Sequence, residues 1–317
     1  MCHSSQLNTY YDTKSKTYHT QKSFEFVSDK LKNSDLVLGN LETTLVPRFE
    51  DYSGYPRFGS PDDFAPTLKE SGFHILSTAN NHSADKGSIG IDHTISKLLS
   101  IGLVPIGTYS SNEDYQNRRN LIIERNGIKI AIYNYTYSTN GIKVPNGRIV
   151  RLIDKETISE DISFAKSKLV DFIIVWYHFG TEYQIKPDSA QINWANYALS
   201  LGADAVIGGH PHVVQRIEKK DEKLVAYSLG NFLSAQNRPF TDGGMILSFD
   251  LIVSKTGKKE FLNILPEPVW VLPAGYKIIP IEDAMNDMTK YPINPNHVRR
   301  MKIYKKEFDN VMKQNDF

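Results

Sequence analysis

Short apolar runs that alternate with amphipathic stretches constrain the fold of this chain most. Each run is rich in Val, Ile or Leu and ends in Gly, Asn or His, or one residue after Gly. The runs cover residues 35–40, 73–80, 103–108, 170–180 and 203–210. Runs of this kind are typical of strands buried on both faces. The stretches 91–102 and 194–202 have the apolar spacing of helices. The alternation predicts an α/β fold with helices on both faces of a sheet.

The pattern changes in the second part of the chain. Residues 120–138 are predicted to form a hairpin with Asn126-Gly127 as its turn. Residues 223–281 are typical of antiparallel strands, and residues 294–315 of a basic, amphipathic helix. Because no linker rich in Pro or Ser interrupts the chain, we expect a single domain over 1–317, with core motifs in 20–240.

Composition excludes several classes of protein. The net charge of +1 gives no basic excess for nucleic acid, so we expect no nucleic-acid partner. The sequence contains no run of about 18 apolar residues, so it predicts no membrane span. The first residues are polar and contain no apolar core of a signal peptide. We therefore expect the chain as written in the cytoplasm. The single cysteine, Cys2, rules out a disulfide within the chain and a zinc site made of cysteines.

Polar side chains gather where the predicted strands end. In open α/β sheets, ligands bind beyond the carboxyl ends of the strands. The residues found there are Asn40 and Glu42 after the first run, Asn80, Asn81 and His82 after the second, His178 and Glu182 at the fourth, His210 and His212 at the fifth, and Asn231 after a later strand. We therefore expect these side chains to share one rim.

The histidines on this rim are suited to a divalent metal. Imidazoles, a carboxylate and an amide oxygen are ligands for Mn, Fe or Zn. In extended chain, His210 and His212 would point to the same side, and Gly208 and Gly209 would let the backbone turn sharply. A single histidine at a strand end is more often a surface residue. Four histidines at three strand ends favour a site over that simpler interpretation.

Five segments extend these strand ends into longer motifs: "SDLVLGNLET" (34–43), "GFHILSTANNHSADKGSIGI" (72–91), "VWYHFGTEY" (175–183), "ADAVIGGHPHVVQ" (203–215) and "AYSLGNF" (226–232). These motifs resemble those of the CapA family of capsule and poly-γ-glutamate biosynthesis proteins. The family is similar to the calcineurin-like metallophosphoesterases. The resemblance implies a four-layer αββα sandwich, two sheets flanked by helices, with a centre of two divalent metal ions.

The resemblance also implies roles for the rim residues. The implied metal ligands are Glu42, as the bridging carboxylate, Asn81, His178, His210 and His212. The implied catalytic residues are His82, facing the leaving oxygen, and Glu182. The implied substrate-binding residues are Asn80, Asn231 and His3. Asp85 is expected to fix the turn before the following helix. Two metal ions, Mn, Fe or Zn, would activate a water molecule for in-line displacement.

One part of the family pattern does not match. Members open with an apolar strand that ends in Gly-Asp and is followed by Met and a basic residue or His. Met1-Cys2-His3 fits the end of that motif, and the strand itself is not in the given sequence. Because losing a buried strand would cost more than the usual stability of about 5–15 kcal/mol, we expect a truncated start. A longer chain would be expected at the cell surface.

Two functions of different classes follow from these expectations. The first is a metal-dependent hydrolase acting on a phosphoester or an anionic polymer. The second is a non-catalytic surface protein that binds or exports poly-γ-glutamate or capsule polymer, in contact with the synthesis machinery. A third possibility is a degenerate member of the family that binds only one metal ion. A polymer binder should carry a basic groove near the rim; the candidates are Lys143, Arg148, Arg151, Lys186, Arg216 and Arg238, most of them expected to be solvated.

Overall fold

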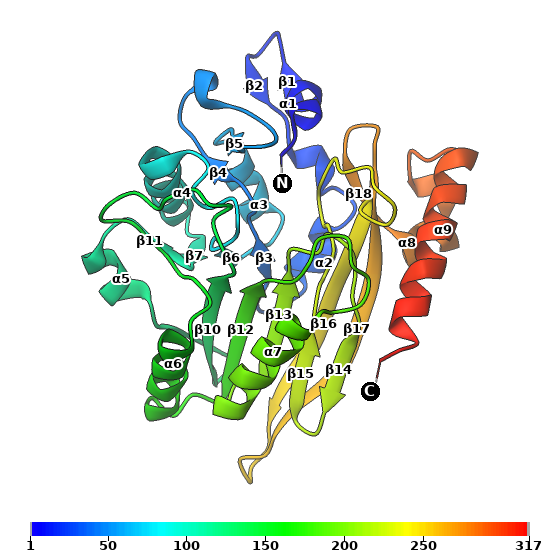
Figure 1. The fold of residues 1–317 in the computed structure, drawn as a ribbon. Coiled ribbons are helices and arrows are strands. Elements are labelled where there is room, and N and C mark those ends of the chain that lie inside the picture. Colours follow the sequence, from blue (N-terminus) through cyan, green and yellow to red (C-terminus); the bar gives the residue numbers. More distant parts are fainter. Residues whose placement is uncertain (1, 316–317) are drawn as a thin grey trace.

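A six-stranded sheet forms the centre of the computed structural model, which describes residues 2–315 (Figure 1). Its order is β14-β15-β13-β12-β10-β9, with bounds β9 Leu121–Arg125, β10 Ile128–Thr136, β12 Phe172–His178, β13 Ala205–Gly209, β14 Ile217–Lys220 and β15 Lys223–Ala226. The four inner strands are parallel, and β9 and β14 are antiparallel edges. Strand β12 is buried along its whole length, as its unbroken apolar sequence predicts.

Two helices cover one face of this sheet, α6 (Lys155–Ser167) and α7 (Ser189–Leu201). Ile158 of α6 and Ala195 of α7 pack in one cluster with Tyr133 and Val175 of the sheet. Helix α7 begins where the Asp188 side chain accepts a hydrogen bond from the backbone N–H of Gln191 at 2.9 Å. This cap fixes the start of the helix immediately after the loop that carries Glu182.

The other face packs on two smaller sheets. One is parallel, with order β3 (Leu38–Asn40), β6 (Ile75–Ser77) and β7 (Val104–Ile106). The other is antiparallel, with order β16 (Gly243–Val253), β17 (Lys259–Leu272) and β18 (Lys277–Pro280). Outside them lie α3 (Phe64–Glu70), α4 (Gly87–Ser100), α8 (Ile281–Asn286) and α9 (Pro295–Met312). The layers are therefore helix, sheet, sheet and helix, as the resemblance implied. The expectation of helices on both faces of one sheet is wrong, because the smaller sheets cover the second face of the six-stranded sheet.

Shorter elements complete the described chain. They are α1 (Ser4–Tyr10), β1 (Tyr11–Asp12), β2 (Thr17–Tyr18), α2 (Ser28–Lys32), β4 (Thr44–Leu45), β5 (Gly59–Ser60), β8 (Thr108–Tyr109), α5 (Asn112–Arg118) and β11 (Ile149–Val150), with single 3₁₀ turns at Gln21–Ser23, Phe49–Asp51 and Met288–Lys290. Leu7 and Phe24 anchor the N-terminal part against Leu76 and Val269 of the smaller sheets. Among the described residues, no helix combines the length and the apolar character needed to cross a membrane.

The sequence patterns locate these elements well. Each of the five apolar runs contains a strand, and Asn126-Gly127 forms the predicted turn, with φ of 52° and 79°. The segment 223–281 divides between two sheets. Strand β15 is antiparallel to β14 but parallel to β13, because the β14–β15 hairpin returns the chain in the direction of β13. The separate antiparallel sheet is formed by β16, β17 and β18.

Candidate metal centre

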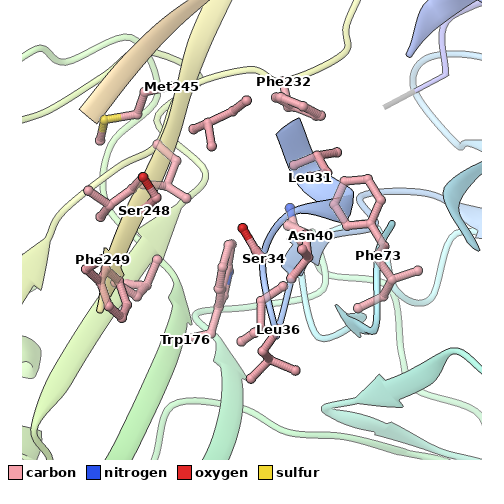
Figure 2. A pocket seen from close by; sticks show the side chains of 18 of the residues that line it. Leu31, Ser34, Leu36, Asn40, Phe73, Trp176, Phe232, Met245, Ser248 and Phe249 are labelled. Carbon is pink, nitrogen blue, oxygen red and sulfur yellow. The ribbon is translucent and has the colours of Figure 1, made fainter. Parts of the chain in front are cut away.

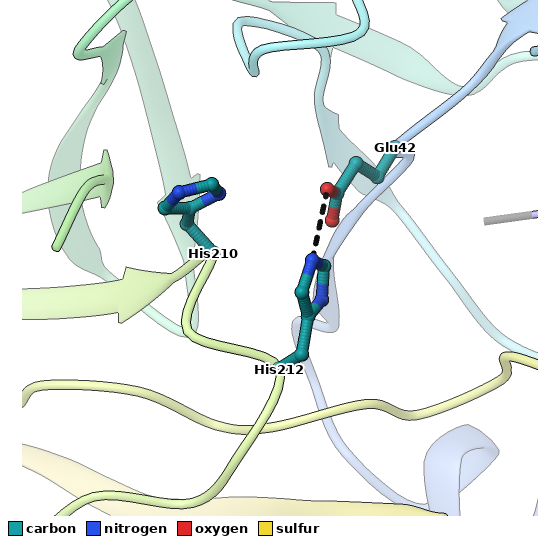
Figure 3. A group of neighbouring side chains, drawn as sticks. All are labelled: Glu42, His210 and His212. Carbon is teal, nitrogen blue, oxygen red and sulfur yellow. Dashed lines mark ion pairs between the residues drawn. The ribbon is translucent and has the colours of Figure 1, made fainter. Parts of the chain in front are cut away.

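Four side chains from both sheet layers meet at one edge of the fold. Glu42 follows β3, His178 is the last residue of β12, and His210 and His212 follow β13. One potential ligand atom from each of Glu42, His210 and His212 lies within 4.8 Å of the others, and all three residues are buried (Figure 3). The carboxyl ends of strands in two different sheets thus bring the predicted residues together.

The Glu42 carboxylate lies at the centre of this group. Its Oε1 is 3.6 Å from Nε2 of His178 and 3.9 Å from Nε2 of His212. Its Oε2 accepts a hydrogen bond from Nδ2 of Asn40 at 3.2 Å. Oε1 is buried and has no hydrogen-bond partner among the described residues. A buried oxygen without a partner is costly, so this atom is available for a cation.

The backbone that presents the two histidines of the His-Pro-His segment is not extended. His210 has φ of 98° and His212 has φ of 61°, so both lie in the left-handed region, and the expectation of an extended pair is wrong. Gly208 and Gly209 were expected to let the backbone turn sharply, and the role of Gly208 in the structure is a different one. A Cβ at Gly208 would lie 2.0 Å from the carbonyl oxygen of Tyr227, so this glycine permits a close approach of two strands. The turn is made by the histidines.

Burial keeps the imidazoles neutral. It lowers the pKa of His210 to about 4 and that of His212 to about 3, and it lowers the pKa of His178 well below its usual value. Burial also raises the pKa of Glu42 to about 7. Neutral imidazole nitrogens and a carboxylate are the donor set of Zn, Mn and Fe sites. The unpartnered Oε1 of Glu42 and these neutral nitrogens therefore fit a divalent ion.

Asn81 and Glu182 contact different histidines of the group. Oδ1 of Asn81 is 2.9 Å from Nε2 of His178, and its Nδ2 donates to Oδ1 of Asn140 at 3.3 Å. Oε1 of Glu182 is 3.9 Å from Nε2 of His212, and this side chain is 41% exposed. Asn81 is thus positioned beside a second potential ligand, His178, whereas Glu182 lies at the solvent side of the group.

His82 forms a separate pair with Asp85. Nδ1 of His82 is 2.7 Å from Oδ2 of Asp85, and the same oxygen accepts the backbone N–H of Phe58 at 2.7 Å. The ring of Phe58 packs edge-on against His82 at 4.6 Å. Asp85 was expected to fix the turn before α4; the structure adds that it orients His82. A carboxylate that accepts from Nδ1 leaves Nε2 of His82 as the acid or base atom.

The three residues expected to bind substrate are differently placed. Nδ2 of Asn80 donates to the carbonyl oxygen of Leu41, so this amide ties two loops together. Oδ1 of Asn231 lies 3.1 Å from Nδ1 of His212 and positions that ring. His3 packs edge-on against Phe58 at 5.2 Å. Contact of all three with a substrate stays a prediction.

Sequence reasoning missed Tyr137. Its ring centroid is 4.6 Å from that of His210, and 44% of the residue is exposed. Tyr137 directly follows Thr136, the last residue of β10, so the rule that sites lie beyond strand ends would have found it. The hairpin pattern of residues 120–138 does not by itself indicate a site at the end of its second strand.

Comparisons with known proteins show the family of this chain. The model of the family described as "Bacterial capsule synthesis protein PGA_cap" matches residues 1–236. The chain belongs to this family. Among curated relatives, the capsule biosynthesis protein CapA of Bacillus anthracis is 29% identical over 261 residues, which are 78% of this chain and 62% of that protein. The PGA biosynthesis protein CapA of Bacillus subtilis is 30% identical over 245 residues, 76% of this chain and 64% of that protein. The chain thus spans less than two-thirds of the length of these relatives.

Solved structures show the same kind of fold. The NAD nucleotidase of Haemophilus influenzae superposes with a TM-score of 0.50 at 15% identity, covering 90% of this chain and 61% of that chain. The calcineurin-like phosphoesterase YfkN of Bacillus subtilis gives a TM-score of 0.49 at 15% identity, covering 93% and 94%. The likeness to the NAD nucleotidase is one of fold alone, and it confirms the expected α/β fold.

Proposed function

We propose that this protein is a divalent-metal hydrolase of capsule or poly-γ-glutamate biosynthesis that acts on a phosphoester or an anionic polymer. The observation that carries the proposal is the buried Oε1 of Glu42, which has no hydrogen-bond partner within residues 2–315. It lies 3.6 and 3.9 Å from Nε2 of His178 and His212, whose imidazoles burial keeps neutral. A structural carboxylate in such a position would be expected to pair with a hydrogen-bond donor.

The proposed metal ligands are the residues of the edge group. Glu42, His210 and His212 would hold one ion, and His178 with Asn81 would extend the group toward a second. When bound, two such ions supply a water activated at neutral pH and a clamp on the oxygens of an in-line displacement. The protein contributes the dry, buried surroundings in which those charges act strongly.

The remaining residues of the site would handle protons and substrate. His82, oriented by Asp85 at 2.7 Å, is the proposed acid that protonates the leaving oxygen from Nε2. Glu182 is the second catalytic candidate, because its exposed carboxylate can accept a proton at the solvent side of His212. Asn231 would act on substrate indirectly, by holding the ring of His212.

A polymer-binding accessory role without catalysis is less well supported. That role would need a basic groove, and several of the candidate cations are paired with acids instead. Arg148 pairs with Asp92, Arg216 with Glu218, and Arg151, which is buried, with Asp161. The relatives named as capsule and PGA biosynthesis proteins support the same biological setting for either role.

The experiment that tests the proposal is metal analysis joined to a substrate screen. We expect the purified chain to take up Mn, Fe or Zn, and to hydrolyse a phosphodiester or a γ-glutamyl polymer. The variant Glu42→Gln with His212→Ala should lose both properties while remaining folded. Binding of the polymer by a chain that takes up no metal would replace the hydrolase with the accessory role.

A further inference from the structure

The proposed metal group has an inner and an outer side. On the inner side, an apolar cavity of about 880 Å³ between strands β3 and β16 reaches Glu42, and its wall includes Trp176 and Met245 (Figure 2). Burying an anionic group against such a wall would be costly. On the outer side, the side chain of Glu182 is 41% exposed and Tyr137 is 44% exposed. An anionic substrate is therefore expected to approach the metal group from the outer side.

Two tyrosine rings border this outer side. The ring centroid of Tyr137 is 4.6 Å from that of His210, and the ring centroid of Tyr183 is 5.9 Å from that of His212. The guanidinium of Arg238 lies over the Tyr183 ring, with Cζ 4.3 Å from the ring centroid. Among the described residues, no cation lies over the Tyr137 ring in this way. The positive charge is therefore on the side of His212.

The backbone of Tyr183 holds its ring in place. Its φ of 65° is in the left-handed region, which is costly for a bulky side chain and is concentrated at functional sites. Its N–H donates a hydrogen bond to the carbonyl oxygen of Pro211 at 2.8 Å, and Pro211 lies between the two histidines of the His-Pro-His segment. The Tyr183 ring is therefore fixed to the segment that carries two proposed metal ligands.

The loop that carries Arg238 is tied to the same segment. Oδ1 of Asn231 lies 3.1 Å from Nδ1 of His212, and its Nδ2 donates to the carbonyl oxygen of Thr241 at 2.9 Å. The Thr241 hydroxyl in turn donates to the carbonyl oxygen of Arg238 at 2.9 Å. Two separate segments, both held to the His-Pro-His segment, thus bring the tyrosine ring and the guanidinium together.

The Arg238 guanidinium is available to a ligand. Within residues 2–315, no carboxylate pairs with Arg238, whereas Arg148 and Arg216 each pair with one. Stacking on an aromatic ring orients a planar guanidinium and leaves the N–H donors at its edge free. These donors form a fork that matches two oxygens of a carboxylate or a phosphate. The arrangement is therefore suited to an anionic group beside the metal group.

We propose that Arg238, oriented by Tyr183, binds a negatively charged group of the substrate that is not the group being cleaved. This proposal rests on the proposed hydrolase function and adds a requirement for its substrate, which carries a carboxylate or a phosphate next to the bond at the metal group. The charged group points toward the loop 231–241, because the unpaired guanidinium is on the side of His212. A substrate without this second charge would lose the contact.

The test measures binding to the full chain by calorimetric titration. The probes are a short γ-linked glutamate oligomer, the same oligomer with its α-carboxyl groups amidated, and a linear oligophosphate. We expect Arg238→Gln to weaken the binding of at least one anionic oligomer about tenfold and to leave that of the amidated oligomer unchanged. The anionic oligomer with the larger loss identifies the group as a carboxylate or a phosphate.

Arg299→Gln is the matched control. Arg299 is also an exposed arginine without a carboxylate partner among the described residues, and it lies on α9. The two variants remove the same net charge, so we expect Arg299→Gln to change the affinities less than about twofold. Arg238→Lys should recover only part of the affinity, because it keeps the charge but not the fork. Equal losses in Arg238→Gln and Arg299→Gln, or no binding of either anionic oligomer by the wild-type chain, would overturn the proposal.

Metal analysis of the same samples separates this proposal from the hydrolase. Metal uptake and hydrolysis, together with equal losses of affinity in the two arginine variants, would refute the role of Arg238 alone. A chain that takes up no metal, but loses affinity in Arg238→Gln and not in Arg299→Gln, would refute the hydrolase and retain the anion-binding site.

Discussion

Oε1 of Glu42 lies 3.9 Å from Nε2 of His212, although the two residues follow strands of different sheets. Glu42 leaves the parallel sheet of β3, β6 and β7, and His212 leaves the six-stranded sheet. The pair therefore depends on how the two layers pack. A site assembled in this way is rigid only when both layers are rigid, so the proposed metal centre depends on the packing of the whole fold.

Glu42→Gln tests the carboxylate. The amide keeps the shape of the side chain but loses its charge, so we expect the affinity for Mn or Zn to fall at least about tenfold. The metal-free protein should remain folded, because burial already disfavours the charged form of this group. Calorimetric titration measures the affinity. Glu50→Gln, at an exposed carboxylate, is the control, and equal loss in both variants would contradict the assignment.

His212→Ala and His210→Ala test the imidazoles. Each should lower the metal content of the purified protein, because each removes a neutral donor from a buried group of three. Neither should unfold the protein. The control is His19→Ala, at an exposed ring remote in sequence from the group. Elemental analysis gives the stoichiometry, and a metal content unchanged from wild type would show that the two histidines are scaffold.

Asp85→Asn tests the orientation of His82. We expect kcat on a phosphodiester to fall by about 10²-fold, since the imidazole loses the partner that fixes its tautomer. Metal affinity should change by less than about threefold, because Asp85 is not in the ligand group. The fold offers a matched control. His93 and Asp62 form the same kind of pair at 2.6 Å outside the site, so Asp62→Asn should leave kcat unchanged.

Much of the site could be predicted because its residues follow unbroken apolar strands. His178 ends a strand whose seven residues are all buried, and such a sequence leaves little choice of secondary structure. The rule that parallel strands end at one edge then brings His178 and His210 together. The order and direction of the strands are therefore sufficient to predict that His178 and His210 lie close together.

Other features depend on atoms that no local pattern encodes. His210 and His212 have left-handed backbone conformations, and Gly208 lies against the carbonyl oxygen of Tyr227, in a contact between segments that are not adjacent in the sequence. The indole Nε1 of Trp176 is buried and has no hydrogen-bond partner among the described residues, and no local pattern predicts this. A sequence gives the type of each side chain but not the contacts that it makes.

Cys2 is expected to resist alkylation in the folded protein. Burial raises the pKa of its thiol to about 12, from 9.0, which lowers the thiolate fraction at pH 8 about a thousandfold. Because the folded value is above the unfolded one, the thiol favours folding below pH 9, and this contribution is lost as the pH rises toward 12.

Labelling with iodoacetamide at pH 8 measures this protection. The reaction should be slow in buffer and reach the rate of a free thiol in denaturant. Since Cys2 lies in the wall of the apolar cavity between β3 and β16, its labelling also reports on that part of the fold. Fast labelling under native conditions would mean that the start of the chain is not packed as described.

Gly208→Ala and Gly209→Ala form a pair that tests the strand contact behind the metal centre. A Cβ at Gly208 would lie 2.0 Å from the Tyr227 carbonyl oxygen, and neither backbone can move without breaking the pairing of β13. We expect a loss of about 1–3 kcal/mol in unfolding free energy.

At Gly209, the nearest atom to a new Cβ is Nδ1 of His178 at 3.9 Å, which is ordinary contact. Gly209→Ala should therefore be tolerated to within about 0.5 kcal/mol. Urea denaturation with unchanged slope gives both values. If the two variants lose stability equally, the close approach of β13 to Tyr227 is not what requires Gly208.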